Sequence, residues 1–314
     1  MLGRTASGVF WLFRYLERAE NTARLLEAGL RMALTRSSDA ASEEWKSVVT
    51  TLGLRGAYEG QGGDYSGLDV CKFVLRSPDN SESVLSMFER ARTNARASRS
   101  SLTREVWEAI NEGWMTLSET LSAEIEEREL GRILAAIRRE STLARGATHG
   151  SMMRNEIYSF ARTGTFLERA DNTARILDVK YYVLLPSLAY IGTALDSGQW
   201  DNILKSLSGE RAYRWLNAGR MSAKSIADFL ILDDRFPRSL AFCYASIREN
   251  LAELAKLHGS EVEAHALMRE ADQRLFKQDI DAIFDLGLHQ FILDFLATNR
   301  RISDAIAVDY RFTA

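Results

Sequence analysis

Apolar residues recur at intervals of three and four along most of the chain, which is the spacing of one face of an α-helix. No segment shows the sustained alternation of apolar and polar residues that a half-buried strand needs. In the segment 8–34, a predicted helix, the apolar face consists of Val9, Leu12, Leu16, Ala19, Ala23 and Leu26. The chain is therefore predicted to be all-α, a multi-helix bundle of about a dozen helices.

Capping residues and helix breakers divide this pattern into elements. The predicted N-caps are Ser7, Ser42, Asn80 or Ser81, Ser122, Ser151 and Ser239. The helix opened by Ser122 is expected to end near Arg145, and six glycines between residues 53 and 67 predict a mobile surface loop. Ser7 and Ser151 open the predicted helices 8–34 and 152–185. Further predicted helices span 69–76, 200–207, 211–216, 223–232, 261–286 and 288–308.

A nine-residue motif occurs twice, and Glu17 and Glu168 occupy the same position in it, about half the chain apart. The two copies are LERAENTAR at 16–24 and LERADNTAR at 167–175, and a degenerate third copy, FERARTNAR, lies at 88–96. This spacing predicts an internal duplication in which each half supplies one motif helix to a shared bundle. Because no polar linker separates the halves, we expect a single domain over 1–314 with pseudo-repeat halves of about 1–150 and 151–314.

Helical geometry arranges the polar residues of the motif in a row. Glu17, Asn21 and Arg24 lie at positions i, i+4 and i+7 and share one face, while the apolar residues cluster on the opposite side. One face of the motif helix therefore packs, and the other presents a carboxylate, an amide and guanidinium groups.

The polar row has two interpretations. In the structural one, Glu17 and Glu168 pair with arginines of the opposing motif helix and fix the helix register, since buried pairs add little net stability but are costly to break. In the functional one, the arginines bind carboxylates or phosphates, the asparagines read amides, and the glutamates recognise an amine or act as general bases. Such a site suits an amino acid or a peptide. The candidate ligand-binding residues are Arg14, Glu17, Arg18, Asn21, Arg24, Glu168, Arg169, Asn172 and Arg175, and no catalytic residue is assigned.

Composition and charge point to an ordinary globular protein. The net charge of −3 gives no reason to expect a nucleic-acid or anionic membrane partner. The helix that carries the third motif copy has a basic side, but Trp107 and Trp114 have core-like spacing and are not interleaved with it for base stacking. This basic side consists of Arg90, Arg92, Arg96, Arg99 and Arg104.

Cysteine usage and the N-terminus predict a cytoplasmic location. Cys71 and Cys243 lie in apolar helical contexts without metal-ligand spacing, which indicates reduced thiols in the core. The N-terminal segment lacks the pattern of a signal peptide. The longest apolar run, 181–195, is interrupted by Pro186 and is shorter than the ~20 residues that span a bilayer.

Motifs for cofactors, metals and covalent catalysis are missing from the sequence. The glycine-rich segment lacks the Lys-Ser/Thr of a phosphate loop, and no Gly-x-Ser-x-Gly or Cys/His arrangement supports a nucleophile. None of the four histidines forms a Glu-x-x-His pair, and Gly259-Ser260 is expected to interrupt the helix that would align His258 with His265. We therefore predict no cofactor and no metal.

At residues 16–24 the sequence resembles the bacterial alpha-E domain family, named for an α-helical domain with a recurrent Glu-Arg motif. The resemblance covers essentially the whole chain and includes MLGRTA at 1–6, SLTREVWEAIN at 101–111 and FPRSL at 236–240. It implies a gene cluster that also encodes a circularly permuted ATP-grasp ligase, sometimes with a transglutaminase-like protein or a proteasome-like peptidase. Glu17-Arg18 and Glu168-Arg169 match the family motif, whereas the copy at 88–96 exchanges its Asn and Thr positions.

The implied setting is ATP-dependent amide-bond formation on a peptide or a small amino compound. We accordingly expect an accessory, non-catalytic helical component that binds the ligase, an amino-acid or peptide substrate, or both, through the motif helices. Two alternatives stay open. One is a stand-alone enzyme that acts on a peptide or amino-acid conjugate with Glu17 or Glu168 as general base. The other is a purely structural assembly protein.

Overall fold

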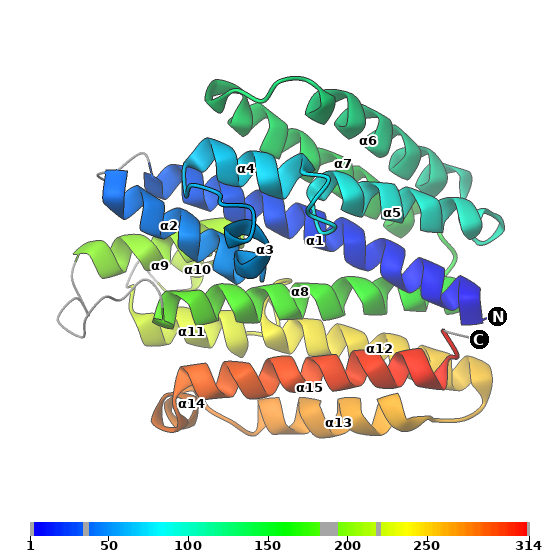
Figure 1. The fold of residues 1–314 in the computed structure, drawn as a ribbon. Helices are drawn as coiled ribbons and strands as arrows, with labels where there is room; N and C mark the ends of the chain where they lie inside the picture. The colour runs from blue at the N-terminus through cyan, green and yellow to red at the C-terminus, as the bar shows by residue number, and fades with distance from the viewer. Residues whose placement is uncertain (1–2, 34–37, 183–193, 218–220, 313–314) are drawn as a thin grey trace. The chain divides into compact units, whose positions relative to one another are not determined.

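The protein is helical throughout the part of the chain that the structure describes (Figure 1). The computed structural model describes residues 3–33, 38–182, 194–217 and 221–312. Over these ranges it contains fifteen α-helices, two short 3-10 helices and no strand, which confirms the predicted all-α bundle. The chain divides into two compact units, Met1–Thr165 and Phe166–Ala314, and the division falls inside helix α8 (Glu156–Tyr182). The predicted duplication stays a prediction.

The first unit is built around α1, which packs against α2, α4, α5 and α7. Helix α1 begins at Gly3 rather than at the predicted Gly8, because Ala6 is buried and extends the apolar face by one turn. The helices of this unit, besides the first part of α8, are α1 (Gly3–Ala33), α2 (Ser38–Thr51), α3 (Arg55–Glu59), α4 (Gly67–Arg76), α5 (Val84–Ala97), α6 (Arg104–Ser122) and α7 (Leu130–Ser151), with 3-10 turns at Arg99–Ser101 and Glu127–Glu129.

Two glycines allow neighbouring helices to approach α1 closely. A Cβ atom at Gly29 of α1 would lie 3.0 Å from the indole of Trp45 on α2. A Cβ atom at Gly164, a residue of α8 that still belongs to the first unit, would lie 2.4 Å from the carbonyl oxygen of Phe10. Because no side chain fits at that distance, the backbone of α8 packs directly on the start of α1.

The glycine-rich segment is more ordered than the sequence predicts. It contains the short helix α3 (Arg55–Glu59) and ends at Ser66, whose hydroxyl caps α4. Tyr58 is buried and donates a hydrogen bond to the carbonyl of Asp64, which folds the segment back on itself. The prediction of an irregular loop over 53–67 is therefore wrong for its first half, since one buried aromatic side chain outweighs the glycine signal.

Several predicted helix ends are wrong because serine hydroxyls also bond to preceding carbonyls. Ser122 does not open a helix but ends α6, where its Oγ donates to the carbonyl of Glu119 at 2.8 Å. Ser151 likewise ends α7, which continues six residues beyond the predicted end at Arg145. The N-cap of α5 is Ser83, not Asn80 or Ser81.

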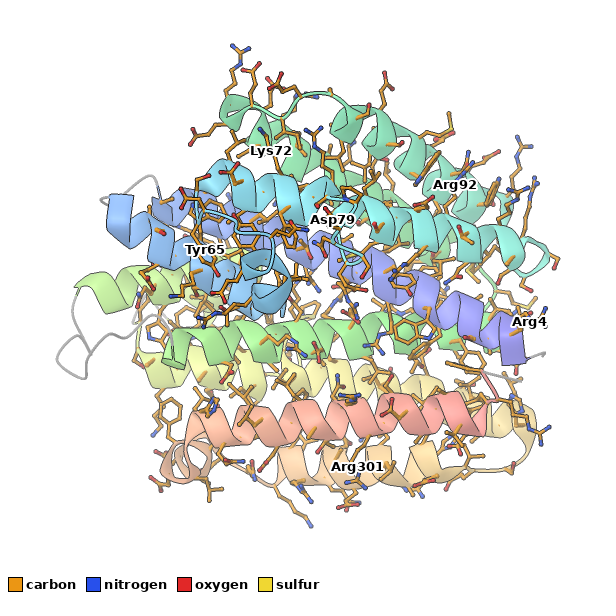
Figure 2. All side chains as sticks on the ribbon, in the orientation of Figure 1. Arg4, Tyr65, Lys72, Asp79, Arg92 and Arg301 are labelled. Carbon is orange, nitrogen blue, oxygen red and sulfur yellow. The ribbon has the colours of Figure 1, made fainter. Side chains whose placement is uncertain are left out.

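The basic residues that were predicted on one helix lie on three elements. Helix α5 ends at Ala97, a 3-10 turn follows, and Thr103 caps α6. Trp107 and Trp114 are half-buried rather than core residues, and guanidinium groups lie over their rings. The guanidinium of Arg92, labelled in Figure 2, lies 4.2 Å from the ring centroid of Trp114. Such cation–π contacts place aromatic surface beside the basic side chains.

In the second unit α12 packs against α13, and α13 packs against α15. Gly259 ends α12 in a left-handed conformation (φ 70°), which confirms the predicted interruption between His258 and His265. The predicted helix 261–286 is instead two helices, because Asp279 caps a new one. Besides the second part of α8, the helices of this unit are α9 (Ala194–Ser206), α10 (Glu210–Leu216), α11 (Ala223–Ile231), α12 (Leu240–His258), α13 (Glu263–Phe276), α14 (Ile280–Leu286) and α15 (Leu288–Asp309).

Both cysteines are free and buried, which confirms the predicted core thiols. Burial raises the pKa of the Cys71 thiol to about 12, so this thiol is protonated and unreactive in the folded unit. Most of the apolar run 181–195 lies outside the described residues. Among the described helices, none is both long and apolar enough to cross a bilayer.

Candidate functional site

The first motif copy holds a network of buried charges on α1. Glu17 and Glu20 are 2% and 0% exposed. Arg145 of α7 contacts both of them, with Nη1 lying 3.4 Å from Glu17 Oε2 and also donating to Glu20 Oε2. On the other side, Arg24 donates to Glu20 Oε1 from Nη2 at 2.7 Å and from Nε at 3.0 Å. Two carboxylates and two guanidinium groups thus form one connected cluster.

This network belongs to a longer ionic seam between α1 and α7. Arg138, two turns before Arg145 on α7, lies 3.1 Å from Glu27, which is two turns after Glu20 on α1. The pairs follow in opposite order along the two helices, as antiparallel packing requires. Ion pairs of Glu17, Glu20 and Glu27 thus connect α1 with α7 in the first unit.

The arginine of the first Glu-Arg pair contacts a different neighbour. Arg18 donates to Glu82, which precedes α5, and Arg90 of the degenerate third copy donates to the other oxygen of Glu82 at 3.1 Å. Two motif arginines thus converge on one carboxylate, which neither interpretation of the sequence had singled out. Glu89, the glutamate of the third copy, is exposed.

The remaining candidates of the first copy line the same helix. The guanidinium of Arg14 lies 4.7 Å from the ring centroid of Trp11, one turn earlier on α1. Asn21 is 2% exposed, and in the sequence it lies between Glu20 and Arg24 of the ionic cluster. The first copy therefore brings Glu17 and Arg24 into one network through Glu20 and Arg145, and the guanidinium of Arg14 contacts an aromatic ring.

The second motif copy contacts the connection that precedes α12, and its Leu167 carbonyl also accepts a hydrogen bond from Asn299 of α15 at 3.0 Å. Arg169, 7% exposed, donates from Nη1 to the carbonyl of Pro237 at 3.2 Å, and Thr173 donates to the carbonyl of Arg238 at 2.8 Å. Both acceptors lie in the connection between α11 and α12, which ends at the N-cap of α12, Ser239. The second copy thus fixes the entry of the chain into α12.

The other residues of this copy are more varied in exposure. Glu168 is 4% exposed, Asn172 is half-buried, and Arg175 is exposed and pairs with Asp171 at 2.6 Å. Asp171 corresponds to Glu20 of the first copy, and Arg175 corresponds to Arg24. The same two motif positions therefore carry a buried pair in one copy and an exposed pair in the other.

Sequence reasoning missed Glu20, Glu82 and Arg145. Glu20 could have been found, since a carboxylate four residues before an arginine on a helix predicts an ion pair. Nothing local marks Arg145 or Glu82, because their partners lie far away along the chain. Whether the candidate residues bind a ligand stays a prediction.

Metal-binding clusters and the buried histidine were the remaining candidates among the described residues. No group of three or more His, Cys, Asp or Glu side chains among them is arranged to hold an ion. His265 is buried, where its Nδ1 accepts from the Val262 amide at 3.1 Å and its Nε2 lies 2.8 Å from the Leu251 carbonyl. This histidine therefore joins α12 to the start of α13.

A family model described as a predicted alpha-helical domain with a conserved ER motif, Alpha-E, matches residues 1–310. The chain belongs to the Alpha-E family. Its Glu-Arg pairs are Glu17-Arg18 and Glu168-Arg169, and the contacts of Glu17, Arg18 and Arg169 are described above. In this Alpha-E chain, the first glutamate lies in a buried network and both arginines contact neighbouring segments of their own unit.

Uncharacterized proteins of Mycobacterium tuberculosis and Mycobacterium bovis are similar to this Alpha-E chain, each with 24% identity over 315 residues. The alignment covers 94% of this chain but only 35% of each relative, so the chain spans about a third of the length of the curated relatives that it matches. No solved structure matches the chain.

Proposed function

We propose that this Alpha-E chain is an accessory helical component of an ATP-grasp-dependent system that forms peptide or amide bonds. It performs no chemical step itself and binds a circularly permuted ATP-grasp ligase, an amino-acid or peptide substrate, or both. A transglutaminase-like protein can belong to the same system. The proposed setting is the cytoplasm, where buried free thiols such as Cys71 and Cys243 stay reduced.

One observation carries the non-catalytic part of this proposal: the carboxylates of the first motif copy are already occupied. A general base needs a carboxylate that can reach the proton of a substrate or a water. Glu17 and Glu20 are almost completely buried, and Arg145 contacts both. An arginine held against a carboxylate favours its ionised, hydrogen-bonded form and supports a positioning role.

The relatives support a role as one part of a larger system. Each is much longer than the matched region, so a domain of this kind occurs together with further sequence in one chain. Within this chain, Arg18 is 30% exposed in its side chain and Arg145 is 27% exposed, so their outer edges are available to a carboxylate of a partner or a peptide.

The test combines the purified chain with the ATP-grasp ligase encoded beside its gene in the native host. We expect a complex by size-exclusion chromatography with light scattering, and a change in the rate or product of ligase turnover when the chain is added. The Glu17→Gln/Glu168→Gln variant should weaken complex formation once its melting curve shows that it is folded. The matched control is Glu89→Gln, because Glu89 is the exposed glutamate of the degenerate copy.

Each alternative has a distinct outcome. Absence of a complex together with unchanged ligase turnover would reject the accessory role. Turnover of a peptide by the chain alone, lost in Glu168→Gln without loss of fold, would identify a stand-alone enzyme. A lower melting temperature of the variants with no bound partner or peptide would identify a structural assembly protein.

A further inference from the structure

The second unit contains a cavity that the motif residues do not reach. It has a volume of about 140 Å³ and lies among α12, α13, α14 and α15. Its wall is mainly apolar and aromatic: Tyr244 stacks on Phe295 with ring centroids 4.7 Å apart, and Phe291 lies 6.4 Å from Phe295. Leu275 of α13 and the exposed Leu286 of α14 also line the cavity. An apolar cavity of about 150 Å³ holds one benzene ring, so this one has room for a single aromatic ring.

A smaller hollow of about 20 Å³ continues the cavity along the same two helices. It shares Ala271, Arg274 and Thr298 with the cavity and adds Glu270 of α13 and Arg301 of α15, the latter labelled in Figure 2. Thr298 and Arg301 are one turn apart, and helical side chains lean toward the N-terminus, so the Arg301 side chain leans toward the cavity. Because the two hollows share three wall residues, we treat them as one groove, with an aromatic end and an end that carries Arg301.

The charges of the groove single out Arg301. Arg274 is paired with Glu270 at 3.2 Å, and Asp294 accepts a hydrogen bond from Gln290 at 2.9 Å. The exposed Arg301 forms no ion pair with a carboxylate of the described residues, although Glu270 lines the same hollow. A ligand carboxylate at this end could therefore pair with Arg301 without first breaking an ion pair of that guanidinium.

Two polar atoms in the cavity wall have no hydrogen-bond partner among the described residues. The hydroxyl of Tyr244 and the Oε1 atom of Gln278 are buried, and neither has a hydrogen-bond partner among the described residues. Burial raises the pKa of Tyr244 above its ordinary value, so this hydroxyl stays neutral. Buried polar groups usually have a partner, and a ligand or a water in the cavity would supply one. An amide N–H next to the ring would suit the acceptor at Gln278.

We propose that this groove binds an aromatic carboxylate, with the ring in the cavity and the carboxylate at Arg301. The ligand is a free aromatic acid or the aromatic C-terminal residue of a peptide, which share this chemistry. The proposal uses a different site from the motif helices and does not depend on a ligase partner.

The probe for the first test is N-acetyl-L-phenylalanine, titrated into the full chain by isothermal calorimetry. For a ligand of this size we expect a dissociation constant of about 1 mM or below. N-acetyl-L-phenylalaninamide, which lacks the carboxylate, should bind about tenfold more weakly. Equal binding of the acid and the amide, or no saturable binding of the acid, would overturn the proposal.

Variants locate the binding on the groove. Arg301→Gln should weaken the acid about tenfold and leave the amide unchanged. Arg300→Gln is the matched control, because Arg300 is the adjacent exposed arginine and lies 3.9 Å from Asp304 outside the groove. Ala271→Leu should fill the cavity and remove binding of both probes. If that buried substitution prevents folding, the exposed Arg301 variant still decides, and an unchanged affinity there rejects the assignment.

The last arm separates the two sources of the carboxylate. A short peptide ending in phenylalanine is compared with N-acetyl-L-phenylalanine and with the same peptide carrying a C-terminal amide. Tighter binding of the free-acid peptide than of the single residue assigns the groove to peptide C-termini, and weaker binding assigns it to free aromatic acids. Binding of the amidated peptide as tight as that of the free acid contradicts both assignments.

Discussion

The two full motif copies have almost the same sequence, but their polar side chains contact different parts of the protein. In the first copy, Glu20 and Arg24 form a buried pair that continues through Arg145 into α7. In the second copy, the equivalent pair, Asp171 and Arg175, is partly exposed and joins two successive turns of α8. In this copy Arg169 and Thr173 donate to the carbonyls before α12, and the carbonyl of Leu167 accepts a hydrogen bond from Asn299 of α15.

The comparison shows which positions of a repeated motif keep the same surroundings and which do not. The small and apolar positions, Leu16, Ala19 and Ala23 with their counterparts Leu167, Ala170 and Ala174, are buried in both copies. The polar positions instead take the partners that the surrounding chain offers. A motif of this kind therefore specifies a helix and its packing face. The non-repeated segments determine which partners its charged side chains contact.

The largest effect is expected when the buried network of the first copy loses its shared cation. Arg145→Met leaves Glu17 and Glu20 buried with one guanidinium fewer, which should lower the free energy of unfolding by about 3 kcal/mol. Labelling of the Cys71 thiol measures this, because Cys71 lies in the first unit and is buried with a raised pKa. It reacts with a thiol reagent only after that unit opens, so the variant should label markedly faster.

The control for this prediction lies on the same helix. Arg132 pairs with Glu129 at 2.6 Å but is 68% exposed in its side chain. Arg132→Met should change the free energy of unfolding by less than about 0.5 kcal/mol. Equal effects of the two substitutions would mean that the buried network contributes no more than a surface pair.

A smaller effect is expected in the second copy. Arg169→Met removes the hydrogen bond to the Pro237 carbonyl, and because Pro237 is exposed, water can replace the donor. The loss should be about 1 kcal/mol. It should accelerate labelling of Cys243, the buried cysteine of the second unit, and leave Cys71 unchanged. Arg175→Met serves as the exposed control, and a parallel increase at Cys71 would contradict separate roles of the two copies.

The sequence was sufficient for the fold class and insufficient for the contacts of the site. Periodicity identified the helices because the buried face of a helix repeats every three to four residues, so it can be recognised from neighbouring residues in the sequence. It did not place Ser122 and Ser151, whose hydroxyls bond backward at helix ends, and it could not show that Tyr58 would order a glycine-rich segment. These outcomes depend on tertiary packing.

The candidate site shows the same limit. Helical spacing placed Glu17 and Arg24 on one face of a helix, and in the structure Glu20 and Arg145 join them in one buried network. It did not identify Arg145 or Glu82, because which distant helix faces a motif residue is decided by the packing of the whole unit. Charge patterning within a helix is predictable from sequence, and charge pairing between helices requires the structure.

The smallest effect compares one motif position in its two settings. Asp171→Asn removes an i, i+4 pair that is 23% and 46% exposed, and it should cost about 0.3–0.5 kcal/mol at low salt and almost nothing in about 1 M salt, where exposed charges are screened. Glu20→Gln at the equivalent position should cost several times more and retain most of that loss in high salt, because its carboxylate is fully buried. Denaturation curves of both variants at two salt concentrations, with Cys243 and Cys71 labelling to assign the unit, measure the contrast. Equal salt dependence of the two losses would show that burial does not distinguish the copies, and their different contacts would then have no energetic counterpart.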